Sequence, residues 1–350
     1  MRLDHFIITR LCHRGYKFGA ARQIIDPLEP KYLELRFKLF EITCLPCILA
    51  QTDQNFGWII IIDKDLRADY RERLSKLVEE KKRVYLYDYD PLKNMQSLEW
   101  IEPFLIGTPD YVLTTSLDSD DAIPKNFVSA IHSHVFKVEQ IGRLPPLKII
   151  ASKQTVQWYL ITSPKAPLGW KCLWHRRAER APRAGFSFLC QYPEYKYSVV
   201  EMAHRHPKNY FDWSEPPFNN RVKRDREAFR ITAEENNENL NYWSVEDTFY
   251  DISKDVGPML RTNHGLNIEK RRLYEIKSNS NKVVGPETFP NIIISWDRAY
   301  KYAKYFKKDV KSLIEVLRQT PVKSYKKGFL YDHFKSIAYK ASMIKWFLKS

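Results

Sequence analysis

The sequence contains few glycines and few cysteines, and both shortages exclude classes of protein. There are 11 glycines among 350 residues, and neither a Walker A motif nor a G-x-G-x-x-G motif occurs. A glycine-rich phosphate loop is therefore missing, which argues against a P-loop kinase and a dinucleotide-dependent oxidoreductase. Five cysteines, an odd number, do not form a disulfide framework and are typical of a reducing compartment.

Long apolar runs are also lacking. No stretch of about 18 apolar residues is free of charge, so the sequence predicts no ordinary transmembrane helix. The first residues, MRLDHFIITRLCHRG, are interrupted by Asp4, His5 and Arg10 and lack the apolar core of a signal peptide. We therefore expect a cytoplasmic protein that is at most peripheral on the inner face of the plasma membrane.

Positive charge is abundant and is concentrated in a C-terminal tail. The chain carries a formal charge of +15, and residues 299–350 hold 13 lysines and arginines against three acids. This tail reads as two amphipathic helices broken near Pro321. One interpretation is packing against the parent domain, and the other is binding to an anionic membrane surface. Because no zinc-finger or RNA-recognition signature accompanies the tail, nucleic acid is not expected as a partner.

Strand-like and helix-like patterns alternate through the first half of the chain. The expected strands are 5–9, 56–62, 84–87 and 111–115, and the expected helices are 32–50, 69–82 and 126–138. Pro46 should bend the end of the first helix. The repeated β-α-β order predicts an α/β fold, with a mostly parallel central sheet flanked by helices and ligands at the carboxyl ends of the strands.

Three aspartates gather directly after the last of these strands. In the segment TTSLDSDDAIP they are Asp118, Asp120 and Asp121. Carboxylates this close repel one another unless a cation neutralises them, and hard oxygen ligands suit Mg²⁺ or Mn²⁺ with substrate phosphates completing the shell. The alternative is an Asp-rich solvated loop or a helix cap. The place after a buried strand favours a cation site.

The remaining patterns are structural. Cys44 and Cys47 form a C-x-x-C motif late in an apolar helix, without the second pair that a zinc site needs, and we interpret them as core cysteines. Alternating stretches in residues 143–200 predict antiparallel strands or a hairpin. The charged residues 219–241 predict an exposed helix or a mobile loop.

Three segments, in order, resemble the rhamnosyltransferase family, glycosyltransferases with the nucleotide-sugar-binding GT-A fold. The segments are HFIITR, FKLFEITCLPCILAQTDQNFGWIIIID and YVLTTSLDSDDAI, and a later HGLN, His264 to Asn267, is similar to the family's late His-Gly-x-Asn. The resemblance covers residues 1 to about 275 and leaves out the basic tail. The sequence departs from the family at Ser116, where an arginine is expected, and this puts one contact to the donor phosphates in doubt.

The resemblance implies a nucleotide-diphosphate sugar as donor substrate and Mn²⁺ or Mg²⁺ as cofactor. It places Asp63, Asp118 and Arg10 around the donor nucleotide. It implies that the metal is held by Asp118, Asp120 and His264, and a neutral imidazole can join carboxylates around Mn²⁺.

An inverting transfer needs a carboxylate that takes the proton of the acceptor hydroxyl. Glu201 is the first candidate because it ends an apolar run. The further candidates are Asp212, Glu194 and, as a neighbour of the metal motif, Asp121. The alternative for each is a surface or structural carboxylate.

We therefore divide the chain into a GT-A domain, a linker and a tail. The domain covers residues 1–275, with a nucleotide-sugar-binding half (1–140) and an acceptor half (141–275), and the linker (276–298) leads to the tail (299–350). The predicted function is transfer of a sugar, rhamnose by the resemblance, to a surface polysaccharide or lipid-linked glycan. The competing hypothesis is a non-catalytic adaptor on anionic membranes with a degenerate GT-A core.

Overall fold

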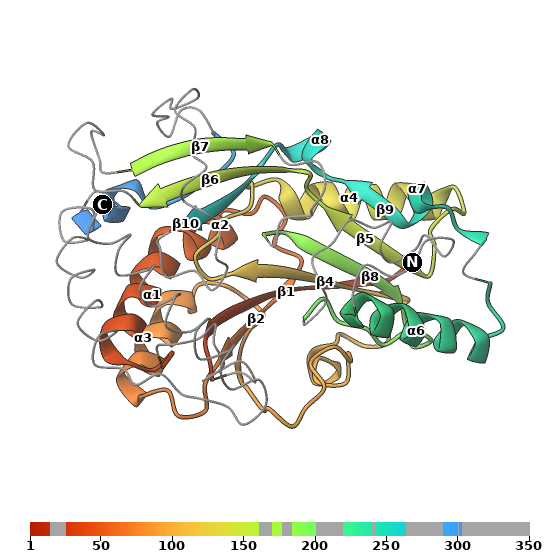
Figure 1. Cartoon of the computed structure of the whole chain (residues 1–350), viewed down its shortest axis with the longest axis horizontal. Helices are drawn as coiled ribbons and strands as arrows, with labels where there is room; N and C mark the ends of the chain where they lie inside the picture. Colours follow the sequence, from red (N-terminus) through yellow and green to blue (C-terminus); the bar gives the residue numbers. More distant parts are fainter. Residues whose placement is uncertain are drawn as a thin grey trace, which may run out of the picture.

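The computed structural model describes most of the first 263 residues and a short segment after them. The described residues are 1–14, 26–160, 170–176, 184–200, 220–239, 242–263, 290–299 and 301–302. They form a seven-stranded sheet and a smaller three-stranded sheet (Figure 1).

The larger sheet is parallel on one side and mixed on the other. Its strands, in spatial order, are β3 (Val84–Asp88), β2 (Gly57–Ile62), β1 (Leu3–Cys12), β4 (Tyr111–Asp118), β8 (Phe186–Gln191), β5 (Leu147–Ala151) and β9 (Phe249–Asp251). The first four run parallel, β8 is antiparallel to both neighbours, and β9 is parallel to β5. The expected α/β fold with a mostly parallel central sheet is confirmed.

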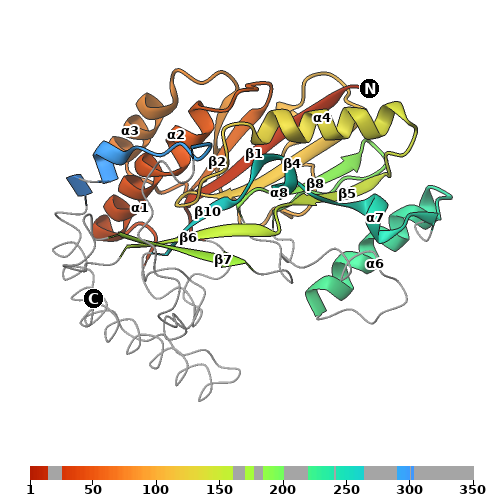
Figure 2. The same cartoon turned by 90° about the horizontal axis from the view of Figure 1, so that it is seen from above.

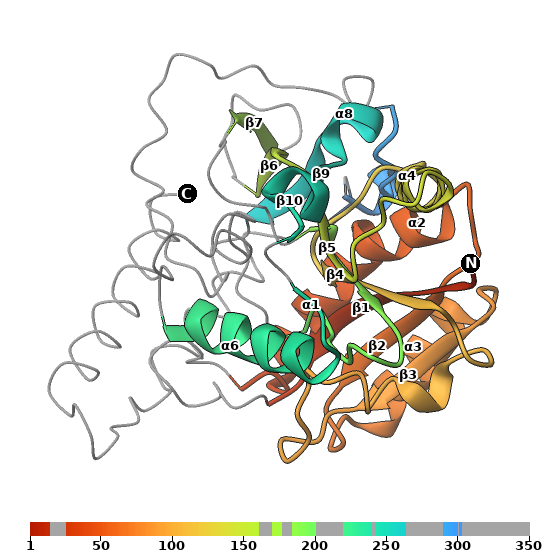
Figure 3. The same cartoon turned by 90° about the vertical axis from the view of Figure 1, so that its right-hand side faces the viewer.

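Both faces of this sheet are covered, as its central strands require. Every residue of β2, GWIIII, is buried, and continuous apolar strands of this kind need a packed layer on each side. One layer consists of α1 (Pro30–Ile42), α2 (Cys44–Leu49), α3 (Ala68–Val78) and α4 (Phe127–Gln140). The other contains residues 95–101, residues 195–200 and α6 (Asn220–Glu235). Figures 2 and 3 show α4 and α6 on opposite sides of the sheet.

The first predicted helix is two helices, and Pro46 explains the break. The prolyl ring removes one N–H and clashes with the carbonyl four residues earlier, which belongs to Ile42. The structure ends α1 at Ile42, and the backbone N–H of Ser295 donates to the Ile42 carbonyl at 2.8 Å. Pro46 therefore interrupts the helix four residues before its own position, at Ile42. The sequence alone predicts a bend near the end of one continuous helix.

The smaller sheet comes from the second half of the chain. Its strands are β10 (Met259–Asn263), β6 (Gln154–Leu160) and β7 (Trp170–Arg176), with β6 and β7 antiparallel and β10 parallel to β6. Two short helices, α7 (Val245–Thr248) and α8 (Ser253–Val256), flank β9, and a 3-10 turn (Glu102–Phe104) precedes β4. Antiparallel strands in residues 143–200 are confirmed, and most of residues 219–241 form the helix α6.

Residues 290–299 and 301–302 pack against the first layer of helices. Ile292, Ile294 and Ala299 are buried in the same core as α1, and Arg298 forms an ion pair with Glu41. The end of the predicted linker thus lies on the domain, while most of the predicted tail helices fall outside the described residues. No helix within the described part of the chain is long and apolar enough to cross a membrane.

Candidate functional site

The carboxyl ends of β1 and β4 meet where the strand order of the sheet reverses. From β1 the chain passes through α1 and α2 to β2 on one side, and β4 lies on the other side of β1. Ligands of open α/β sheets bind at the carboxyl ends of strands around such a switch point. Arg10 of β1 lies directly opposite Asp118, the last residue of β4.

Residues 118–121, which we call the acidic turn, are paired with arginines from other elements. Nη2 of Arg10 donates to Oδ1 of Asp118 at 2.8 Å. Nη1 of Arg36, on α1, lies 3.3 Å from Oδ2 of Asp120, and its Nη2 donates to Oγ of Ser119. Among the described residues, the cations that neutralise these two carboxylates are therefore guanidinium groups.

The acidic turn is also joined to β10, which lies far along the chain. Ala122 and Leu260 exchange backbone hydrogen bonds of 3.0 and 2.9 Å. The backbone N–H of Thr262 donates to Oδ1 of Asp121 at 3.0 Å. The strand runs from Ala122 toward Asp121 and ends at Asn263, the last described residue before His264.

Burial and like charge perturb the titration of this turn. Burial, and then the carboxylates of Asp120 and Asp118, raise the pKa of Asp121 well above its ordinary value, against the effects of Arg261 and the Thr262 N–H. Burial opposes the charge of Arg36, but its carboxylate neighbours outweigh this and raise its pKa. The carboxylates of Asp118 and Asp120 thus raise the pKa of both neighbours, Asp121 and Arg36.

Asp63 lies at the same edge of the sheet, directly after β2. Its carboxylate accepts backbone N–H groups from Arg14 at 2.7 Å and Asp65 at 3.0 Å. The guanidinium of Arg14 pairs with Asp26 and Asp65. The structure therefore brings Asp63, Arg10 and the acidic turn to one edge, as expected for the carboxyl ends of β2, β1 and β4.

Several predicted site residues lie outside the described residues. They are Glu201, Asp212 and His264. Val200, the last described residue before Glu201, is buried, and the N–H of its neighbour Val199 donates to Thr114 of β4 at 2.9 Å. The chain therefore leaves the described part beside the middle of β4, and Glu201 stays a prediction.

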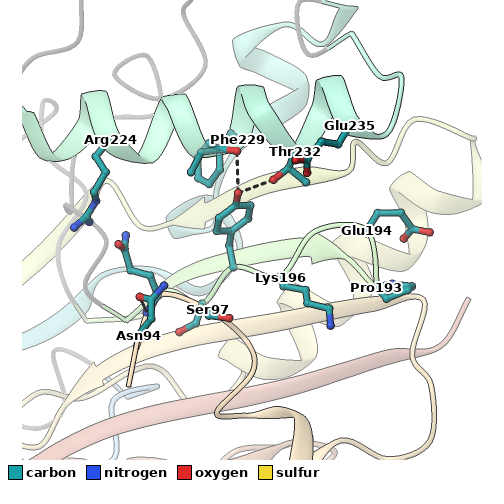
Figure 4. Close-up of a pocket in the computed structure, with 13 residues that line it drawn as sticks. Asn94, Ser97, Pro193, Glu194, Lys196, Arg224, Phe229, Thr232 and Glu235 are labelled. Atoms are coloured by element: carbon teal, nitrogen blue, oxygen red, sulfur yellow. Dashed lines mark hydrogen bonds between the residues drawn. The ribbon is translucent and has the colours of Figure 1, made fainter. Parts of the chain in front are cut away.

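Glu194 lines a cavity that contains no residue of the acidic turn. This cavity, of about 480 Å³, lies between residues 94–97, residues 193–198 and α6 (Figure 4). The N–H of Tyr192, two residues before Glu194, donates to the Asp110 carbonyl, at the amino end of β4. Asp118 is the last residue of that strand, so the backbone near Glu194 is attached at the amino end of β4 and the acidic turn lies at its carboxyl end.

Sequence reasoning named Arg10 but missed two other arginines whose charges act on the turn, Arg36 of α1 and Arg261 of β10. Arg36 lies on the helical face of Leu33, Phe37 and Phe40, all of which are buried. A charged residue within an apolar stripe needs an internal partner, so this position carried a signal. Arg261, on β10, gave no comparable signal because its strand is recognised only from the tertiary pairing.

The cysteine interpretation is confirmed. Cys44 and Cys47 are free, fully buried thiols, and burial raises the pKa of Cys47 to about 12. A thiol that holds its proton in this way is neither a redox nucleophile nor a ready metal ligand.

The acidic turn fits a hard divalent cation in its chemistry, because the carboxylate oxygens of Asp118 and Asp120 are the kind of ligand that Mg²⁺ and Mn²⁺ take. The coordination set is not complete in the described part of the chain, where no three His, Cys, Asp or Glu side chains are grouped to hold a metal ion. The predicted remaining ligand, His264, lies outside it.

Comparison with solved structures returns several glycosyltransferases at low similarity. S. aureus TarS 1-349 in complex with UDP shares 10% identity with a TM-score of 0.32, covering 99% of this chain and 70% of that chain. Mouse xyloside xylosyltransferase 1, apo form, shares 10% identity with a TM-score of 0.26, covering 71% and 84%. TM-scores of this size do not establish a shared fold.

Comparison with protein families gives a match in the first half of the chain. None of the curated proteins matches this sequence. The family described as "Putative rhamnosyl transferase" matches residues 17–154, a stretch that contains α1, Asp63 and the acidic turn. Over those residues, the chain is similar to this rhamnosyltransferase family, which confirms the resemblance for the segments at 37–63 and 111–123; HFIITR and HGLN lie outside the matched residues.

Proposed function

We propose that the protein is a GT-A glycosyltransferase that transfers a sugar from a nucleotide-diphosphate donor. The observation that carries this proposal is the acidic turn at the switch point of the sheet, with Arg10 and Asp63 at the same edge. The family match over residues 17–154 supports the same chemistry, and its description favours rhamnose as the sugar. A surface polysaccharide or a lipid-linked glycan is the proposed acceptor.

Roles for the described residues follow from their places. Asp63 closes β2 and is proposed to face the nucleobase, whereas Asp118, paired with Arg10 across β1 and β4, faces the ribose and phosphates. The Arg10 guanidinium fixes the direction of the Asp118 carboxylate and adds positive charge where the diphosphate would leave.

Asp118, Asp120 and His264 are the proposed ligands of Mn²⁺ or Mg²⁺. A divalent cation bound there would stabilise the negative charge that develops on the departing diphosphate. The link between Thr262 and Asp121 supports His264 in this role, because it holds the chain two residues earlier against the acidic turn. Asp121, buried and bonded to that chain, would keep the two parts of the site in register.

The proton acceptor in the transfer is proposed to be Glu201. A base must reach the acceptor hydroxyl beside the donor, and the described chain before Glu201 runs over β4 on the face opposite α1–α4. Asp212 is the second candidate. Glu194 is the weakest candidate because the chain beside it is bonded at the amino end of β4, away from the acidic turn.

The nucleotide and the metal can be tested together by thermal unfolding. UDP, dTDP and GDP, each with and without Mn²⁺, should include one nucleotide that raises the melting temperature of the wild type, because a ligand that binds only the folded state stabilises it. The stabilising nucleotide would name the donor base. Hydrolysis of the matching sugar nucleotides, rhamnose first, should then depend on Mn²⁺ and on Asp120.

The variant for that assay is Asp120→Ala, and Asp110→Asn is a matched control at the amino end of β4. Equal hydrolysis by wild type and Asp120→Ala, with and without Mn²⁺, would reject the proposed metal site. The adaptor hypothesis makes the opposite prediction, because it requires liposome binding through residues 299–350 and no nucleotide affinity. Stabilisation by any of the three nucleotides would therefore contradict the adaptor hypothesis.

A further inference from the structure

Arg36 joins the acidic turn to α1 from inside the protein. Its side chain is 14% exposed, and the Asp120 side chain that it faces is 6% exposed. The guanidinium contacts two successive residues of the turn, Ser119 through Nη2 and Asp120 through Nη1. A planar, rigid group that reaches two neighbouring residues fixes the direction of both.

This pair is nearly withdrawn from water, and that makes each partner depend on the other. A buried charge without a counter-charge is strongly unfavourable, so Asp120 and Arg36 need a partner of opposite sign in every state of the protein. In the described structure, Arg36 and Asp120 are counter-charges of each other. A divalent cation that bound Asp120 would have to take over the partnership and would leave a guanidinium beside a second positive charge.

We propose that Arg36 is a positioning residue that acts as the resident counter-cation of Asp120, and that it lowers the affinity of the acidic turn for a free divalent cation. The cation and the nucleotide diphosphate then bind together. When the cation takes Asp120, the phosphates replace Asp120 as the negative partner of Arg36. This inference rests on the proposed function for its second half. Its first half concerns only this chain and a metal ion.

Electrostatics gives the sign of the effect of Arg36 on cation binding. Two positive charges a few ångströms apart in a poorly hydrated site repel strongly, so binding a cation beside Arg36 is penalised unless anions arrive with it. The arrangement therefore predicts positive coupling between Mn²⁺ and a nucleoside diphosphate. Coupling of this kind is reciprocal, so each ligand raises the affinity for the other by the same factor.

The test measures Mn²⁺ binding without turnover. Free Mn²⁺ is followed by electron paramagnetic resonance during titration of wild type and Arg36→Gln, first with the metal alone and then with UDP or dTDP present. We expect Arg36→Gln to bind Mn²⁺ alone at least about tenfold more tightly than wild type, because one nearby positive charge is gone. In the wild type, the nucleotide should raise Mn²⁺ affinity, and this gain should shrink in the variant.

Arg73→Gln is the matched control. Arg73 also bridges to α1, with Nη1 at 2.8 Å from Glu34 and Nη2 at 2.6 Å from Glu41, but it contacts no residue of the acidic turn in the described structure. Its substitution should leave Mn²⁺ affinity unchanged. An equal change in both variants would assign the effect to loosening of α1 and would overturn the proposal.

Arg36→Lys keeps the test decisive if Arg36→Gln does not fold. Lysine retains the positive charge but lacks the planar fork that reaches Ser119 and Asp120 together, so Mn²⁺ affinity should stay near that of wild type while nucleotide affinity falls. Unchanged Mn²⁺ affinity in Arg36→Gln, or stronger binding in Arg36→Lys than in Arg36→Gln, would overturn the proposal. If no nucleotide affects any variant, the proposed glycosyltransferase fails, and the titration with Mn²⁺ alone still decides the role of Arg36.

Discussion

The imidazole rings of His5 and His132 meet inside the protein, with Nδ1 of His5 3.1 Å from Nε2 of His132. The contact belongs to a chain of side chains: Nδ1 of His132 lies 2.7 Å from Oδ2 of Asp53, Nε2 of His5 lies 2.8 Å from Oγ1 of Thr115, and that hydroxyl lies 2.7 Å from Oγ of Ser187. Because an ionised carboxylate only accepts hydrogen bonds, every donor in the chain points toward Asp53. Both rings are then neutral and carry their proton on Nδ1.

This chain predicts that the protein loses stability in mild acid. Burial, with the neighbouring His132 and Arg83, lowers the pKa of His5 well below its ordinary value of 6.5, and burial also lowers the pKa of His132 against the pull of Asp53. The unfolded chain therefore binds protons first as the pH falls. Stability should be complete above about pH 6.5 and should decline below it. Urea unfolding followed by circular dichroism between about pH 5 and about pH 8 measures this.

His5→Leu tests the assignment. The variant leaves His132 and Thr115 without their shared partner, so unfolding at neutral pH should become easier by about 1–3 kcal/mol. It also removes one buried histidine, so the decline in acid should be shallower than in wild type. An unchanged decline would show that other groups cause the pH dependence.

Asp118→Asn should reduce hydrolysis of the donor by roughly 100-fold while leaving the fold intact, because the Asp118 carboxylate forms a part-buried pair with Arg10 at the end of β4 and does not belong to the apolar core. Steady-state release of the nucleotide measures the effect. Asp110→Asn, directly before the other end of that strand and paired with Arg2, is expected to behave as wild type. Comparable rates for wild type and Asp118→Asn would remove Asp118 from the site.

Gly57→Ala should destabilise the junction of β1 and β2. A methyl group at Gly57 would lie 2.7 Å from two carbons of the Phe6 ring, which is fully buried and paired with Gly57 in the strand register. Crowding of this kind costs about 1–3 kcal/mol. The double variant Gly57→Ala with Phe6→Leu should recover part of the loss in urea unfolding, and no recovery would show that the strain lies elsewhere.

Tyr197→Phe should loosen α6. The Tyr197 hydroxyl donates to the carbonyl of Ala228 at 2.9 Å and lies 2.8 Å from Oγ1 of Thr232, both on that helix (Figure 4). Loss of these hydrogen bonds should lower the free energy of unfolding by about 1 kcal/mol. Tyr242→Phe is the control because that side chain is 79% exposed. Equal stability of the two variants would show that Tyr197 does not hold the helix.

The local pattern of apolar residues was enough to predict the strands of the parallel half of the sheet. The run GWIIII is apolar at every position, and only a strand covered on both faces accommodates such a run in an α/β protein. The rule that ligands gather at the carboxyl ends of strands pointed to the acidic turn, and the family resemblance added Asp63, which lies directly after β2 at the same edge. These predictions succeeded because an apolar run and the residues directly after it are adjacent in the sequence, so both the buried strand and its carboxyl end can be recognised locally.

The counter-charges of the acidic turn could not be predicted in the same way. Arg36 is 83 residues from Ser119, and Thr262 is 141 residues from Asp121, although each pair is hydrogen-bonded. Periodicity records that a position is buried but does not name its partner. The expectation of a neutralising cation was therefore made with Arg10 at the site but without the Arg36 guanidinium, which α1 supplies.

The bond between Thr262 and Asp121 has a consequence for synthesis of the protein. A ribosome makes the acidic turn long before it makes β10, so a nascent chain can pair β1, β2, β3 and β4 while the turn still lacks its late neighbour. The turn of the emerging chain would lack the backbone partners that β10 supplies. Premature termination before β10 would remove both the Thr262 hydrogen bond to Asp121 and the bridge from Leu260 to Ala122, so the proposed donor site depends on a strand that is made 141 residues after the turn.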